Sequence, residues 1–171
     1  MKKLLALMII AGLSGLYAGS IGLGIAYDDF MHSDSTVSAY PSIRADIMTN
    51  ILPILGLRTG LVNVDIKEDE AGGTMFSLGT GVFCDLCLFI PMASSITPYI
   101  PLGVWYFNKY QGFDMSHLAF KGGLGGMMAF GGINGYLELG VNFTSVTPEG
   151  GESSSDHWFY GQLGVRVPVG M

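Results

Sequence analysis

Residues 136–143 of this chain read Tyr136-Leu137-Glu138-Leu139-Gly140-Val141-Asn142-Phe143. Every second residue from Leu137 onward is large and apolar, and the residues between them are small, polar or charged. Successive side chains of a β-strand point to opposite faces, so this period of two predicts a strand with one apolar face.

Seven more stretches of this kind occur elsewhere in the chain, and the connections between the eight stretches alternate between long and short. The long connections are 28–35, 67–73, 108–114 and 148–156, and the tighter joints lie at 50–53, 91–94 and 131–134. A barrel that crosses a bilayer has tight turns on one rim and longer loops on the other. The alternation slips near Val62, where we expect a β-bulge. The pattern predicts an all-β fold, an eight-stranded antiparallel up-and-down transmembrane β-barrel.

The composition fits apolar residues that are spread through strands. The 171 residues have a mean hydropathy of +0.44, only 13% are charged, and 26 are glycine. Beyond the N-terminus, no run approaches the roughly 18 apolar residues that a spanning helix requires.

The N-terminus has the features of an export signal. Lys2 and Lys3 precede an apolar run from Leu4 to Leu13, and small residues then lead to a cut after Ala18. We predict a signal peptide over residues 1–18 and one barrel domain over residues 19–171; the alternative is a short N-terminal helix that stays in place.

Alternation alone does not say which face of the strands looks inward. A soluble lipocalin-like barrel buries its apolar face and solvates the other, which should then carry abundant Lys, Glu and Thr. Here the non-apolar face is mainly Gly, Ser and Ala, which suit the narrow lumen of an eight-stranded barrel. We therefore expect the Leu, Val, Ile and Phe side chains to face lipid.

A few charged residues interrupt this face of small residues. They are Arg44, Asp46, Arg58, Asp85, Lys121, Glu138 and Arg166. Unpaired buried charges cost several kcal/mol each, so we expect salt bridges among these four cations and three anions. Such a network would plug the lumen; the alternative is a gated, ion-selective passage.

Aromatic residues gather near the strand ends that meet the long connections. They are Tyr27, Tyr40, Trp105, Tyr106, Phe107, Trp158, Phe159 and Tyr160. Aromatic side chains concentrate where a membrane meets water, so this grouping suggests one interfacial ring. The alternative is that aromatic residues cap strand ends, as in any β protein.

The acidic residues and the two cysteines restrict the partners. Without residues 1–18 the chain has 6 basic and 14 acidic side chains, a net charge of about −8, and most acids lie in the long connections. This argues against nucleic acid, whose phosphates need Lys and Arg. Cys84 and Cys87 should project to opposite faces roughly 10 Å apart, too far for a disulfide. We predict no metal site and no cofactor.

The whole segment from residue 19 resembles the small eight-stranded outer-membrane barrels of the OmpX and OmpA transmembrane-domain type. The last strand is similar to the assembly signal of that family, through Gln162, Gly164, Val167 and Val169. Members usually end on an aromatic residue, whereas this chain ends Val169-Gly170-Met171. The resemblance implies a bacterial outer-membrane location, contact with lipid and lipopolysaccharide, and insertion by the barrel-assembly machinery.

Some barrels of this size resemble enzymes that modify lipid A. The residues that could supply such chemistry are His32, Ser33, Asp34, His117 and His157, the last of which follows Ser155 and Asp156. Catalysis requires a base within hydrogen-bond reach of the nucleophile, which adjacent loop residues do not establish. We expect a monomeric, non-enzymatic platform for surface interactions, with four acidic extracellular loops. The alternatives are a narrow pore or solute conduit and, third, a lipid A-modifying enzyme.

Overall fold

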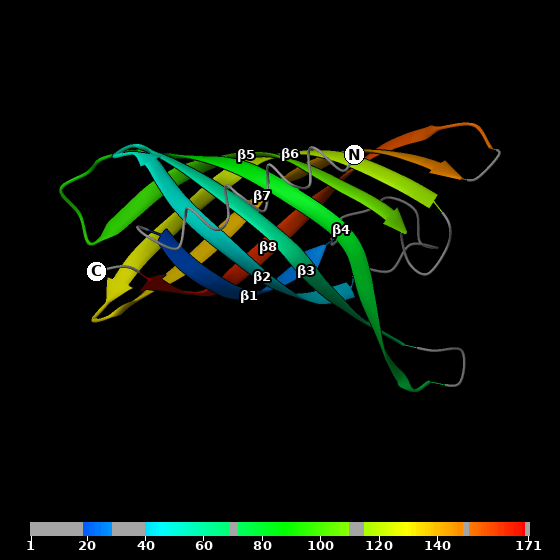
Figure 1. The fold of residues 1–171 in the computed structure, drawn as a ribbon, viewed down its shortest axis with the longest axis horizontal. Helices are drawn as coiled ribbons and strands as arrows, with labels where there is room; N and C mark the ends of the chain where they lie inside the picture. Colours follow the sequence, from blue (N-terminus) through cyan, green and yellow to red (C-terminus); the bar gives the residue numbers. More distant parts are fainter. Residues whose placement is uncertain (1–18, 29–39, 69–71, 110–114, 149–150, 170–171) are drawn as a thin grey trace.

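The strands of this protein close into a barrel. The computed structural model describes residues 19–28, 40–68, 72–109, 115–148 and 151–169. These residues form β1 (Gly19–Asp28), β2 (Tyr40–Leu52), β3 (Leu55–Glu68), β4 (Thr74–Phe89), β5 (Ile96–Lys109), β6 (Met115–Phe130), β7 (Ile133–Pro148) and β8 (Ser154–Val169). Each strand pairs antiparallel with the next, and β1 also pairs with β8, so the sheet closes on itself (Figure 1). The predicted eight-stranded antiparallel barrel is confirmed. Within the described ranges, no helix is long and apolar enough to cross a membrane.

The two rims of the barrel differ. The rim that carries Gly19 and Val169 also holds the connections at residues 53–54, 90–95 and 131–132. Gly131 has a positive φ of 62°, which glycine adopts without the steric cost that other residues meet. At the opposite rim, the β3–β4 and β7–β8 hairpins extend beyond the rest of the barrel (Figure 1). The connection at residues 90–95 is longer than the tight joint predicted at 91–94.

The apolar side of every strand faces outward, as predicted. Leu124 is 69% exposed, Phe143 60% and Leu163 58%, whereas Arg58, Asp85 and the other charged residues of the opposite face are buried. A protein dissolved in water arranges its strands in the opposite way. The barrel therefore has the inverted pattern of a transmembrane barrel, with apolar side chains outside and polar ones inside.

The irregularity expected near Val62 is a bulge in β3. Ala45 pairs with Val62 and Ile47 pairs with Thr59, so two residues of β3 oppose the single residue Asp46. The inserted residue restores the facing of β3 beyond this point, which explains the slip in the sequence pattern.

The prediction of an interfacial ring of aromatic residues is only partly correct. Tyr27 and Phe159 are exposed on the outer surface, but Trp105 is 5% exposed and Tyr160 is fully buried. Both lie on the inward side of their strands, next to outward-facing Tyr106 and Phe159. Proximity to a strand end was therefore misleading, because the alternation assigns neighbouring residues to opposite faces. Trp158 is partly buried, and the side chains of Tyr40 and Phe107 lie outside the described residues.

Glycines on the inward face make room for large side chains. A Cβ at Gly125 would overlap the ring of Tyr99, and one at Gly24 would overlap the hydroxyl of Tyr136. Gly123 and Gly140 lie under Tyr160 in the same way. The small-residue face is therefore not an empty lining, because its gaps accept aromatic rings from other strands.

Adjacent glycines on opposite faces of β6 allow a direct test of this fit. In Gly123→Ala the new methyl group would meet the carbonyl oxygen of Leu139, the Tyr160 hydroxyl and the Cα of Gly140, so we expect a loss of about 1–3 kcal/mol. In Gly122→Ala it would meet only Leu102, at 3.8 Å, and the change should stay within about 0.5 kcal/mol. Urea unfolding in lipid vesicles, followed by gel mobility without heating, measures both variants. Equal destabilisation would contradict the fit.

Candidate functional site

Four charged side chains form one cluster across the middle of the lumen. Arg58 on β3 donates to Asp85 on β4 through its Nε at 2.9 Å, and its guanidinium also lies 2.9 Å from Glu138 on β7. Lys121 on β6 lies 2.9 Å from both Asp85 and Glu138. In an eight-stranded barrel β3 and β7 are diametrically opposite, so the contact between Arg58 and Glu138 spans the lumen.

Two tyrosines complete the environment of Glu138. The Tyr99 hydroxyl donates to one carboxylate oxygen at 3.0 Å, and the Tyr160 hydroxyl donates to the other at 2.9 Å. Six strands, β3 to β8, thus contribute to the cluster. Glu138 is fully buried; Arg58, Tyr99 and Tyr160 supply hydrogen bonds, and Lys121 adds a second positive charge, so the buried carboxylate can remain charged.

A second ion pair links β8 to β2. Arg166 donates to Asp46 at 2.6 Å and to the hydroxyl of Ser20 at 3.3 Å. This pair crosses over β1, where Gly22 leaves the space: a Cβ there would lie 2.9 Å from Arg166 and from both carboxylate oxygens of Asp46. The guanidinium of Arg166 also lies 5.4 Å from the ring centre of Tyr136.

The remaining cation, Arg44, contacts an amide side chain and an aromatic ring. Its guanidinium donates to the side-chain oxygen of Gln162 at 3.4 Å and lies 3.9 Å from the ring centre of Trp105. A guanidinium over an aromatic face is attracted by the electron-rich ring. Gln162 in turn donates to the Tyr136 hydroxyl at 2.8 Å. The fourth positive charge of the lumen therefore sits beside an aromatic ring.

Apolar layers lie on both sides of the central cluster. Towards the long connections, Phe83 and Trp105 pack with ring centres 5.3 Å apart, together with Ala119. Towards the tight turns, Met48, Cys87 and Tyr99 pack together, with Phe89 and Met127 against them. These layers place apolar side chains on both sides of the ion pairs, and apolar surroundings strengthen the attraction between charges.

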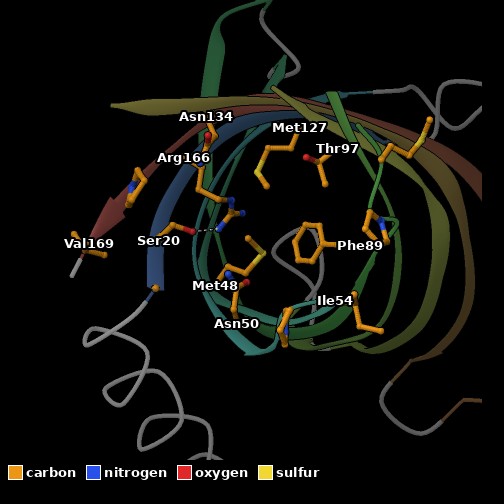
Figure 2. Close-up of a pocket in the computed structure, with 15 residues that line it drawn as sticks. Ser20, Met48, Asn50, Ile54, Phe89, Thr97, Met127, Asn134, Arg166 and Val169 are labelled. Carbon is orange, nitrogen blue, oxygen red and sulfur yellow. Dashed lines mark hydrogen bonds between the residues drawn. The ribbon is translucent and has the colours of Figure 1, made fainter. Parts of the chain in front are cut away.

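Beyond the second apolar layer lies a cavity at the tight-turn rim, with a volume of about 590 Å³. Exposed turn residues such as Pro53, Ile54 and Met92 line its rim, so the cavity opens at this end of the barrel. In Figure 2, Arg166, Met48, Met127 and Phe89 point into it from separate strands. The sequence pattern gave no sign of this cavity.

Of the other candidate residues, the structure describes the side chains of Ser155, Asp156 and His157. His32, Ser33 and Asp34 lie outside the described residues, as does the side chain of His117. The His157 side chain is 70% exposed; its Nδ1 lies 3.9 Å from Asp156, and its ring stacks on Phe143. Among the described residues, no group of three or more His, Cys, Asp or Glu could hold a metal ion.

The two cysteines lie apart on β4, and both are free. Cys87 is buried in the lumen, whereas Cys84 is partly buried and follows the outward alternation of Val82 and Leu86.

The four residues of the assembly-signal motif divide between the two faces of β8. Gln162 and Gly164 face inward, where Gln162 joins the hydrogen bonds of Arg44 and Tyr136. Val167 is 46% exposed on the outer surface, and Val169 ends the strand. The predicted signal peptide, residues 1–18, lies outside the described residues.

Comparison with known proteins finds similarity only among solved structures. No protein-family model matches the chain, and no curated protein matches it. A major outer membrane protein from Thermus thermophilus aligns with a TM-score of 0.46 and 11% identity, over 89% of this chain and 100% of that one. Outer membrane protein H (OprH) from P. aeruginosa, solved in DHPC micelles, gives 0.46 and 16%, over 88% and 99%. Similarities this distant say nothing about what this chain binds or does.

Replacing Glu138 tests the central cluster. In Glu138→Gln, Arg58 and Lys121 keep their charges but lose a buried anion, so the free energy of unfolding should fall by about 3–5 kcal/mol. Glu152→Gln makes the same change at an exposed position and should stay within about 0.5 kcal/mol. Urea titration of both variants in the same lipid vesicles measures the difference. A loss below about 1 kcal/mol in Glu138→Gln would show that the network contributes little.

Proposed function

We propose that this protein resides in the bacterial outer membrane, as a monomeric barrel with a closed lumen that presents acidic loops for surface interactions. The observation that carries the proposal is the inverted barrel. Exposed apolar side chains lie on seven of its eight strands, the outward Leu55 and Leu57 of β3 are partly exposed, and the charged residues of the lumen are buried. A closed sheet also satisfies its backbone N–H and C=O groups internally, as the hydrocarbon of a membrane requires.

The contacts across the lumen support a closed barrel over a pore. Arg58, Lys121 and the two acids of the central cluster bond to each other from both sides of the lumen, with an apolar layer above and below. The interior of an eight-stranded barrel is just wide enough for side chains to fill. Ions would have to break several of these pairs to pass.

The acidic charge of the long connections supports a role in surface interaction. Glu152 and Asp156 are exposed at this rim. The side chains of the other acidic residues predicted there lie outside the described residues. Such a rim could bind divalent cations in a lipopolysaccharide layer or simply keep the loops solvated. We propose a non-enzymatic role; the side chain of His157 is 70% exposed, and its described contacts are Asp156, 3.9 Å from Nδ1, and the ring of Phe143.

We also propose that β8 is recognised by the barrel-insertion machinery during assembly. Its inward residues, Gln162 and Gly164, serve packing and hydrogen bonding in the lumen, whereas Val167 lies exposed on the outer face. We assign this recognition to outer residues such as Val167, which remain exposed when the barrel is closed against β1.

A charge on the outer surface tests the membrane location. Leu139 is 54% exposed near the middle of β7, so Leu139→Arg should destabilise the barrel in lipid vesicles by about 2–4 kcal/mol. Ser145→Arg places the same charge on the same side of β7, six residues closer to the long connections, where the cost should fall to about 0–1 kcal/mol. Equal stability of the two variants would argue against hydrocarbon around the barrel, as would recovery of the protein from soluble periplasm.

Planar-bilayer recording tests the closed lumen. The inserted wild-type barrel should give no stepwise current, because the central ion pairs and the two apolar layers fill its cross-section. Insertion is verified in parallel by the gel mobility of the unheated protein. Reproducible conductance steps with ion selectivity would contradict the closed lumen and favour the narrow pore.

A further inference from the structure

The cavity at the tight-turn rim differs from the rest of the lumen, because it is lined by both apolar and polar side chains. Met48, Phe89 and Met127 form much of its inner wall, and Ser20, Asn50 and Thr97 supply polar groups. Its volume of about 590 Å³ falls within the range of small-molecule pockets. We refer to this cavity as the vestibule.

Among the described residues that line the vestibule, Arg166 is the one that carries a charge. It is 2% exposed and is fixed in place by Asp46 and Ser20. A guanidinium has five N–H donors, and the bonds to Asp46 and Ser20 engage Nη2 and Nη1. Its side chain reaches into the vestibule (Figure 2), where further donors can meet a ligand.

The inner end of the vestibule is sealed. Met48 packs against Cys87 and Tyr99, and the Tyr99 hydroxyl donates to Glu138 of the central cluster. A ligand that enters from the tight-turn rim therefore meets a floor that connects directly to the buried ion pairs. The vestibule is a pocket with one entrance and not a segment of an open channel.

We propose that the vestibule binds a single-chain anionic amphiphile, with its carboxylate at Arg166 and its alkyl chain against Met48, Phe89 and Met127. Arginine suits this role because its planar donors match the geometry of a carboxylate. Methionine side chains are flexible and polarisable, so they adapt to an alkyl chain of variable shape. This site goes beyond the closed surface platform, since it faces the opposite rim.

The test uses the full barrel in nanodiscs of zwitterionic lipid, with the methionine methyl groups labelled for NMR. Sodium decanoate is the probe, at a pH at which its carboxylate is ionised, and decyltrimethylammonium is the matched cation. We expect decanoate to give saturable shifts of the Met48 and Met127 methyl signals. Met128, the neighbour of Met127 on the outer face, should report only partition into lipid and should not saturate.

Two sets of variants separate the vestibule from the membrane. Met127→Trp fills the vestibule and leaves every charged residue intact, so decanoate should bind about tenfold more weakly or not at all. Met128→Trp makes the same change on the lipid side and should leave the affinity unchanged. The double variant Asp46→Asn/Arg166→Gln removes both charges of the pair together, leaving neither charge without its partner. It should also weaken decanoate binding about tenfold.

Each alternative outcome overturns the proposal. Shifts that never saturate, or that appear equally at Met128, would mean partition into lipid only. Equal affinity for decyltrimethylammonium would remove the role of Arg166, and unchanged affinity in Met127→Trp would place the probe elsewhere. Gel mobility of each unheated variant verifies that the barrel is folded, so a failure here is distinguishable from a failure of the membrane location.

Discussion

The closure of the sheet between β1 and β8 is the constraint on which the rest of the structure depends. Ten consecutive residue pairs, from Gly19↔Val169 to Asp28↔Tyr160, join the first strand to the last. Once the sheet is closed, no strand edge remains to be covered, and the side chains divide into an outer and an inner set. If the outer set of side chains is apolar, the barrel requires lipid around it; if the inner set is apolar, it requires water.

Here the inner set holds the charges, and the barrel must neutralise them within its own width. Arg58, Lys121 and Glu138 reach one another because only eight strands surround the lumen. A glycine makes room for the second ion pair, because Gly22 leaves space for the contact between Arg166 and Asp46. The narrow lumen thus brings its buried charges within reach of partners on other strands.

The lumen is organised in layers along the barrel. An apolar layer with Phe83 and Trp105 lies towards the long connections, and the central ion pairs follow. The layer with Met48 and Tyr99 comes next, and the vestibule opens beyond it. Among the described residues, a packed apolar layer therefore lies on the long-connection side of the ion pairs, whereas the tight-turn rim presents a pocket.

The sequence predicted the strands, their facing and the bulge near Val62, because alternation at period two is a local property of the chain. It also predicted which charged residues share the inner face. It did not predict which of them pair, because the contact between Arg58 and Glu138 depends on the curvature and closure of the sheet. For the same reason, Tyr99 and Tyr160 were not recognised as partners of Glu138, and the vestibule left no sequence signal. Closeness to a strand end suggests an interfacial position for Trp105 and Tyr160, whereas the alternation turns both side chains inward, where they are buried.

The most direct measurement of what surrounds the barrel is the collision of dissolved probes with a spin label. In a background with Cys84 and Cys87 replaced by serine, nitroxides are attached at Leu163→Cys and Val165→Cys on the outer face of β8, in lipid vesicles. If hydrocarbon surrounds these residues, the labels will collide frequently with oxygen, which dissolves in lipid, and rarely with a water-soluble nickel chelate. Frequent collision with the chelate and rare collision with oxygen would mean that water surrounds the apolar face, and would contradict the account.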